Sequence, residues 1–141
     1  MSAILKENAD AVATALNAEA FSLPFAAQVS FRPRAEVRER NQLAVLVVPG
    51  KITSQRENRG HLRRTLEIYV VIQRRLWDED EDIKELLQLA EEIETFLNGR
   101  TVGGCFTCTQ IEMDPAFVIE HVDQMALFTT VMTSTWIVRR Q

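Results

Sequence analysis

The segment that decides the fold reads LRRTLEIYVVIQR over residues 62–74. Its apolar side chains follow an alternating pattern, and one face of the segment carries Leu66, Ile68, Val70 and Ile72. A period of two indicates a β-strand, because successive side chains of a strand point to opposite faces of its sheet. This is the longest and clearest strand signal in the chain, so we expect it to form the centre of a sheet.

Two shorter strands are predicted before the central one. Residues 43–48 are apolar and rich in β-branched side chains, and a Pro-Gly pair closes them with turn chemistry. Residues 25–31 show a short alternating pattern, which the charge-rich stretch 34–40 interrupts. Residues 51–60 are polar and lack an apolar period, so we predict an exposed loop that could form the mobile tip of a long hairpin.

The chain also contains two segments with helical spacing. Over residues 2–20, leucine and valine side chains recur on one helical face, with charged residues on the other positions. The second helix begins at the acids of residues 78–82, which suit the positive end of a helix dipole. Its apolar stripe continues to residue 97 and closes with an Asn-Gly pair, a typical C-terminal cap.

The C-terminal part returns to strand patterns. A strand over residues 103–113 is broken by an Asp-Pro pair, and a long final strand follows over residues 124–138. The predicted order is α-β-β-β-α-β-β. This order favours an α+β fold, with two helices packed on one face of a mostly antiparallel sheet of about five strands. No internal repeat or linker is visible, so we expect a single domain over residues 1–141.

Composition excludes several classes of protein. The chain has 141 residues, 46% of them hydrophobic, which is enough for a folded core without metals or disulfides. A net charge of −4 argues against a surface built wholly to neutralise nucleic acid. The longest apolar run, residues 43–48, is far shorter than the roughly 20 residues of a membrane-spanning helix. Charged residues near the start leave no export signal visible, so we expect a soluble protein made in a cytoplasm.

The one cysteine motif is the C-x-x-C spacing of Cys105 and Cys108. In a redox enzyme this motif begins a helix, and in a zinc site it needs a second pair of ligands. Here it falls on a predicted strand, where residues three apart point to opposite faces. We interpret the two cysteines as structural residues of the sheet.

No other motif predicts a catalytic or ligand site. His61 and His121 are isolated from nucleophile and metal-binding spacings, and the glycines of residues 99–104 precede a strand instead of opening a helix. The acids of residues 78–82 lack the glycine and alternating ligands of a calcium loop. We therefore predict no catalytic residues, no metal, no cofactor and no small-molecule substrate, which disfavours an enzyme.

The charges of the chain are divided between two regions. Residues 32–64 carry nine Arg or Lys against three Glu, a net charge of +6, and residues 78–94 carry one Lys against nine acids, a net charge of −8. Opposite patches on one subunit favour head-to-tail association that closes a ring. An intramolecular match, or two solvated faces, would explain the same pattern. The candidate interface or lumen-facing residues are Lys51, Arg56, Arg59, Arg63, Arg64, Asp78, Glu79, Asp80 and Asp82.

Five stretches together carry a resemblance to a known family. They are the helix end FSLP (residues 21–24), the strand and turn LAVLVVPG (43–50), the strand YVVIQRRL (69–76), the helix LLQLAEEIETFL (86–97) and the closing strand over 128–140. In this layout, and over nearly its whole length, the sequence resembles the tail terminator or tail completion proteins of long-tailed bacteriophages, such as the lambda tail terminator.

The resemblance implies a structural virion subunit with no catalytic residues. Such a subunit forms a ring, a hexamer, at the head-proximal end of the tail, stops tail-tube polymerisation and joins the tail to the head connector. Its partners would be its own copies, the tail tube protein and a neck or connector protein, assembled in the host cytoplasm. The basic residues 51–64 could face DNA in the lumen or an acidic neighbour. Other readings left open are another neck protein, a tail tube subunit or a small nucleic-acid-binding module.

Overall fold

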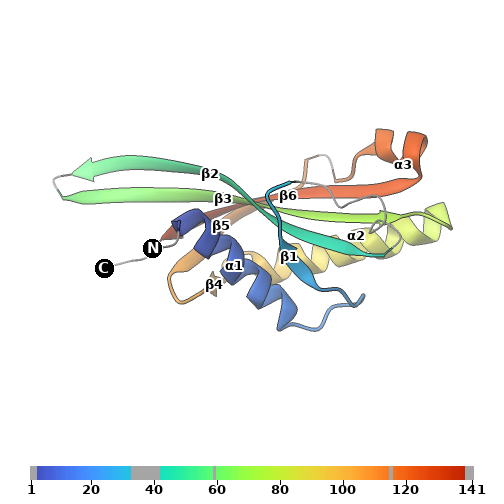
Figure 1. The fold of residues 1–141 in the computed structure, drawn as a ribbon, viewed down its shortest axis with the longest axis horizontal. Helices are drawn as coiled ribbons and strands as arrows, with labels where there is room; N and C mark the ends of the chain where they lie inside the picture. The colour runs from blue at the N-terminus through green and yellow to red at the C-terminus, as the bar shows by residue number, and fades with distance from the viewer. Residues whose placement is uncertain (1–2, 33–41, 59, 115, 139–141) are drawn as a thin grey trace.

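The central strand of the sheet is β3 (His61–Arg75), as the sequence predicts. In the computed structural model, which describes residues 3–32, 42–58, 60–114 and 116–138, β3 pairs antiparallel with β2 (Ala44–Asn58) and with β6 (Leu127–Val138). The apolar face of β3 predicted from its period is completely buried; it consists of Leu66, Ile68, Val70 and Ile72. Burial on this face and pairing on both edges make β3 the element around which the sheet is built (Figure 1).

The described sheet has six strands in the order β1-β2-β3-β6-β5-β4. On one side, β1 (Ala27–Val29) pairs parallel with β2; on the other, β5 (Phe106–Glu112) pairs antiparallel with β6, and β4 (Thr101–Val102) with β5. The sheet is therefore mixed, with one strand more than the roughly five predicted. A two-residue strand such as β4 is too short to show a period, which is why its sequence pattern was not recognisable.

Two helices pack on one face of the sheet and enclose the main core. The predicted first helix is α1 (Ile4–Asn17), and the predicted acidic helix is α2 (Glu79–Leu97), which ends before a glycine with positive φ. Their apolar stripes meet the inward side chains of β2, β3 and β6 in one cluster, which includes Val12, Leu16, Leu86, Leu89, Ile93, Val47, Ile68, Met132 and Trp136. The two predicted helices lie on one face as expected, but a third, short helix also contributes a side chain to this core, so the predicted number of helices was one too few.

The predicted final strand over residues 124–138 was wrong at its start. A third helix, α3 (Ile119–Met125), precedes β6, and Ala126 ends it in the left-handed conformation with φ of 50°. Seven residues make only two turns, too few for an amphipathic stripe to stand out from the sequence. The observed element order is α-β-β-β-α-β-β-α-β.

The predicted loop over residues 51–60 was also wrong in its main part, because β2 continues through residue 58. The Pro49-Gly50 pair is a bulge within the strand instead of its end. A Cβ atom at Gly50 would lie 2.7 Å from the carbonyl oxygen of Glu67, so this close approach requires glycine. The hairpin predicted as an alternative is present, and Gly60 turns it with φ of 84°. The charge-rich stretch 34–40 lies outside the described residues.

Replacing Ile68 by alanine tests the assignment of the core. Ile68 lies at 0% exposure between β2 and β6, so Ile68→Ala should lower the free energy of unfolding by about 2–5 kcal/mol, through lost burial and a residual cavity. Chemical denaturation measures this loss. Ile52→Ala is the matched control, because Ile52 lies on the same face but is 45% exposed and should cost far less. Equal losses at both positions would show that the core is misplaced.

Candidate interaction surfaces

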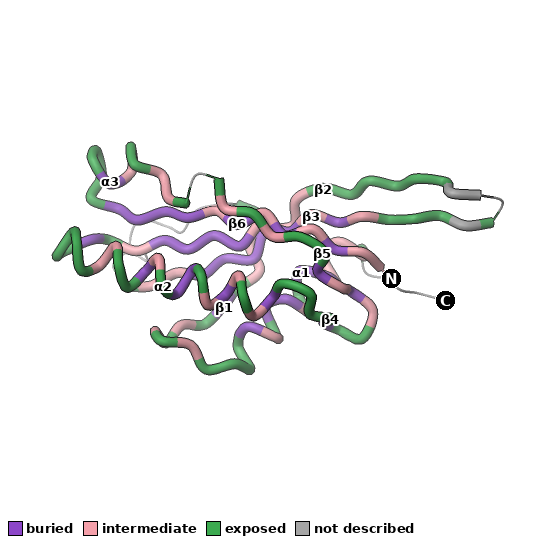
Figure 2. Tube along the Cα trace, turned by 180° about the vertical axis from the view of Figure 1, so that it is seen from behind, coloured by how far each residue is buried: buried purple, intermediate pink, exposed green. Residues whose placement is uncertain are grey.

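The distal part of the β2–β3 hairpin projects beyond the rest of the sheet. Pairing of β1 with β2 stops at Val47, and pairing of β6 with β3 stops at Thr65. Residues 52–58 of β2 and 61–65 of β3 therefore form a two-stranded ribbon, which β6 borders only at its base, at Thr65 (Figure 1). Figure 2 shows the ribbon as mostly exposed, in contrast to the buried middle of β3. Such a projecting ribbon presents both faces to a partner.

The ribbon carries the predicted basic residues on both of its faces. Arg56 lies opposite Leu62, and Ser54 lies opposite Arg64, so these side chains share the face of Leu66 and the helices. Arg63 lies opposite Gln55, on the other face. Lys51, at the base of the ribbon, forms an ion pair with Glu67 at 3.6 Å. Arg59 lies outside the described residues.

Apolar side chains accompany the cations on the helix side of the ribbon. Ile52 is 45% exposed and Leu62 is 54% exposed, which is unusual for a face that continues the buried face of β3. A cleft of about 230 Å³ opens beneath the ribbon, and it is lined by Ile4 of α1, Leu62 and Arg64 of the ribbon, and Val138 at the end of β6. The lining of the cleft therefore combines three aliphatic residues with one arginine.

The predicted acids at the start of α2 divide into two groups. Asp78, Glu79 and Asp80 are exposed at the N-terminus of the helix, where the dipole favours negative charge. Asp82 is instead engaged within the molecule: its Oδ2 accepts the backbone N–H groups of Trp77 at 2.8 Å and Asp78 at 3.1 Å. The exposed acids are thus free to face a partner, whereas Asp82 fixes the start of the helix.

Asp82 also pairs with Arg74, the next-to-last residue of β3. Its Oδ1 lies 3.1 Å from the guanidinium, and both side chains are 15% exposed. The N–H of Trp77 first, and then that of Asp78 and the charge of Arg74, hold the pKa of Asp82 below its ordinary value against the opposing effect of desolvation. The ionised carboxylate therefore connects the sheet to α2.

Trp77 stands exposed beside these acids. Its side chain is 66% exposed, and the guanidinium of Arg74 lies 6.0 Å from the ring centroid. The N–H of Leu76 donates to the carbonyl of Ala126 at 2.8 Å, which brings Trp77 next to the end of α3. There Met125 is 48% exposed. The structure thus places Trp77 on the surface.

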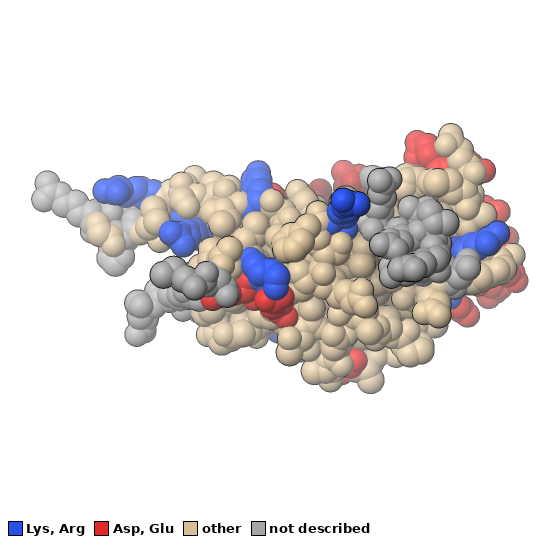
Figure 3. All heavy atoms as spheres, viewed as in Figure 1, with Lys and Arg blue, Asp and Glu red and all other residues tan. Residues whose placement is uncertain are grey.

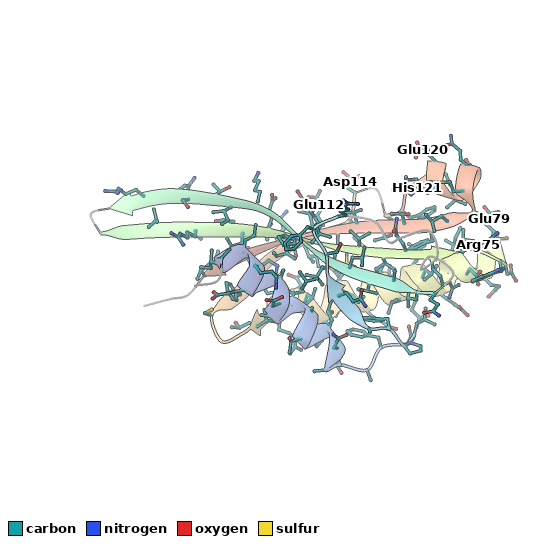
Figure 4. All side chains as sticks on the ribbon, viewed as in Figure 1. Arg75, Glu79, Glu112, Asp114, Glu120 and His121 are labelled. Atoms are coloured by element: carbon teal, nitrogen blue, oxygen red, sulfur yellow. The ribbon has the colours of Figure 1, made fainter. Side chains whose placement is uncertain are left out.

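The basic ribbon and the acidic helix start lie at opposite ends of the molecule. Figure 3 shows Lys and Arg along the ribbon at the left end, and Asp and Glu concentrated at the right end. In Figure 4, Glu79 of α2 and Glu120 of α3 both lie at the right end. The strand β3 joins the two ends, and its 15 residues span about 45 Å at roughly 3.3 Å per residue.

This separation argues against an intramolecular match between the ribbon and the start of α2; Arg34, Arg38 and Arg40 of the basic region lie outside the described residues. The distance is several times the Debye length of about 8–10 Å at physiological salt, so the regions barely interact within one copy. Among the described ion pairs, none joins the ribbon to the first turn of α2. Each charged end is therefore available to another molecule.

The cysteine motif and His121 pack or form hydrogen bonds within the subunit. Cys105 lies in the turn before β5, and Cys108 is buried on β5; both thiols are free, and burial raises the pKa of Cys108. His121 on α3 contacts the hydroxyl of Thr129 through Nδ1 at 2.7 Å, and Thr129 also accepts from Gln73. Within residues 3–32, 42–58, 60–114 and 116–138, no group of three or more His, Cys, Asp or Glu side chains converges on a metal-sized site.

A second hollow lies between α2 and the segment after α1. It measures about 500 Å³ and is lined by Glu19, Ala20, Phe21, Gln88, Glu91, Glu92, Thr95 and Phe96. The carboxylate of Glu92 accepts the N–H of Ser22 at 2.9 Å, which lowers the pKa of Glu92. Glu92 thus connects α2 to the segment leading into β1.

Comparison with protein-family models gives no match, and comparison with curated proteins gives no significant match. None of the helices in the described chain is long and apolar enough to cross a membrane.

Replacing Asp82 tests its role at the start of α2. At pH 7, Asp82→Asn should lower the free energy of unfolding by about 1 kcal/mol, because the charge that accepts two N–H groups and pairs with Arg74 is lost. The folded-state pKa is below the ordinary 3.8, so this stabilisation is complete above pH 3.8 and disappears as pH falls through the folded-state value. Denaturant unfolding from pH 7 downward measures the convergence of variant and wild type.

The matched control for Asp82 is Glu81→Gln, one residue earlier in the same turn. Glu81 is exposed and its only described ion pair, with Lys84 at 3.5 Å, is also exposed, so its loss should change stability by less than about 0.5 kcal/mol. A pH-independent effect of Asp82→Asn would contradict the assignment.

Proposed function

We propose that this chain is a structural subunit that associates head to tail with its own copies and closes a ring, with no catalytic role. The observation that carries the proposal is the placement of a basic ribbon and an acidic helix start at opposite ends of one elongated subunit. A heterologous contact uses two different patches of each copy, so it repeats around a ring when the rotation closes. Opposite charges also accelerate encounter and reject misaligned copies.

The proposed setting is the neck of a long-tailed bacteriophage, where a hexameric ring would cap the tail tube and offer its other face to the head connector. The resemblance of the sequence to tail terminator proteins supports this setting, as does an α+β subunit whose distinctive features are surfaces and a projecting hairpin. On this proposal the further partners are the tail tube protein and a connector protein, and DNA passes through the lumen. Another neck protein or a tail tube subunit would use the same self-association.

A nucleic-acid-binding module is the second candidate, because the ribbon has one specific feature in its favour. A two-stranded β-ribbon is a shape that enters the major groove of DNA, and this one carries Arg56, Arg63 and Arg64. The net charge of −4 and the acids at the other end oppose strong binding to phosphate backbones. Titration of the purified protein with duplex DNA at two salt concentrations separates this reading from self-association.

Native mass measurement of the purified protein, combined with electron microscopy, tests the ring. We expect masses at multiples of the 16.1 kDa subunit and ring-shaped particles, and we expect purified rings to stop the polymerisation of the cognate tail tube protein in vitro. A protein that stays monomeric at the highest attainable concentration would contradict the proposal. Rings that leave tube growth unchanged would favour another neck role.

Charge reversal tests the contact between copies. The double variant Arg56→Glu, Arg64→Glu should remain folded but lose assembly, and so should Asp78→Lys, Asp80→Lys, because each places like charges against the unchanged patch of its neighbour. Mixing the two variants should restore association, since the two altered patches again have opposite signs. Arg32→Glu, at an exposed position after β1, is the control and should assemble normally. Analytical ultracentrifugation measures all four samples.

A further inference from the structure

We infer that Trp77 of one copy inserts into the cleft beneath the ribbon of the next copy, the cleft lined by Ile4, Leu62, Arg64 and Val138. This inference rests on the proposed function and adds the residues that anchor the contact. The occupant is a second copy of this chain. The charge pattern alone does not explain the exposed apolar side chains at the two ends of the subunit.

The exposed apolar side chains coincide with the charged ends. Of the six large hydrophobic residues that are exposed in the described chain, Ile52 and Leu62 lie on the basic ribbon, and Trp77 and Met125 lie at the acidic end. Exposed leucine and tryptophan side chains are not expected on a charged face that contacts only water, whereas an interface combines apolar anchors with a charged rim. Each end therefore has the composition of one half of an interface.

The cleft has the size and lining for a single large side chain. Its volume of about 230 Å³ is below the roughly 300 Å³ at which small-molecule pockets begin, so a residue from another protein suits it better than a free ligand. Three of its four lining residues, Ile4, Leu62 and Val138, are aliphatic, and they come from three different elements. An aromatic ring in the cleft would cover the exposed part of Leu62.

Trp77 is the side chain at the acidic end that fits this description. It is 66% exposed, and it stands where β3 leads into α2, held by its own N–H bond to Asp82. A tryptophan fixed in position by its backbone loses little conformational freedom on binding, and tryptophan and arginine are the commonest anchors of protein interfaces. The hydrogen bond from the Trp77 N–H to Asp82 thus fixes the backbone and leaves the ring available for the contact with the next copy.

Electrostatics fixes the orientation of the proposed contact. Asp78, Glu79 and Asp80 follow Trp77 directly along the chain, so they accompany the ring to the ribbon of the neighbour. Arg64 lines the cleft and Arg56 lies on the same face of the ribbon, so the acids would meet guanidinium groups at its rim. Arg64 would also contact the face of the indole ring. Contact between two ribbons would place cations against cations, and contact between two helix starts would place acids against acids.

The anchors are tested by Trp77→Ala and Leu62→Glu, each of which removes one half of the contact at an exposed position. Either variant should weaken self-association at least 30-fold while its circular dichroism stays that of the wild type, because truncating a central anchor typically costs about 2 kcal/mol or more, at 1.4 kcal/mol per factor of ten. Two controls match them: Phe31→Ala removes another exposed aromatic ring, and Gln55→Glu adds an acid to the opposite face of the ribbon. Both should assemble as the wild type does.

Mixing the two defective variants gives the decisive measurement. The Trp77→Ala copy keeps an intact cleft and the Leu62→Glu copy keeps Trp77, so one intact junction remains between them. We expect a 1:1 heterodimer in native mass spectra and nothing larger, because the outer halves of that dimer are both defective. Absence of the heterodimer would overturn the inference.

The two tryptophans supply an independent readout in the unaltered protein. Trp136 is completely buried, whereas Trp77 is largely exposed, so acrylamide quenching of fluorescence reports on Trp77. Quenching should fall on assembly of the wild type. Assembled protein with a fully quenchable Trp77, or variants that assemble normally, would overturn this inference and leave the ring proposal standing. A wild type that never associates would overturn both.

Discussion

The two-sided pairing of β3 is the constraint on which the rest of the structure depends. Its backbone bonds to β2 along one edge and to β6 along the other, and its inward face, with Ile68 near the middle, is fully buried under α1 and α2. The strand is paired on both edges from Thr65 to Arg75, and it continues into the ribbon, where β2 alone pairs with it. It therefore acts both as the middle of the core and as the rod that keeps the ribbon and the start of α2 at opposite ends of the molecule.

That separation gives the charges their proposed use. Charge complementarity mainly governs the rate and orientation of encounter, whereas affinity comes from apolar anchors that exclude water around them. Both components are present at each end: Leu62 accompanies the cations of the ribbon, and Trp77 accompanies the acids of α2. The backbone N–H of Trp77 donates to Asp82, so the carboxylate that stabilises the start of the acidic helix also holds the apolar anchor in place.

Parts of the fold with a long period could be predicted from sequence, and short or fully exposed parts could not. The central strand and α2 each show many repeats of one pattern, so the buried face of each could be predicted from the sequence. Helix α3 has two turns, and β4 has two residues, which leaves no period to detect. The β2 half of the ribbon was predicted as a loop because both of its faces meet solvent: it needs no alternation of apolar residues, and only its pairing with β3 shows that it is a strand. Of the candidate surface, the charges were predicted, and the cleft and the exposure of Trp77 were not.

The sequence by itself determined the sign and chain position of each charge cluster and the strand that becomes the core, because charge and periodicity are properties of neighbours along the chain. Only the tertiary structure decided how far apart the clusters lie, which face of the ribbon carries Leu62 with Arg64, and that the ends of α1, β3 and β6 enclose a cleft. These features depend on register and on contacts between residues far apart in sequence. A register shift of one residue would move every side chain of the ribbon to its other face.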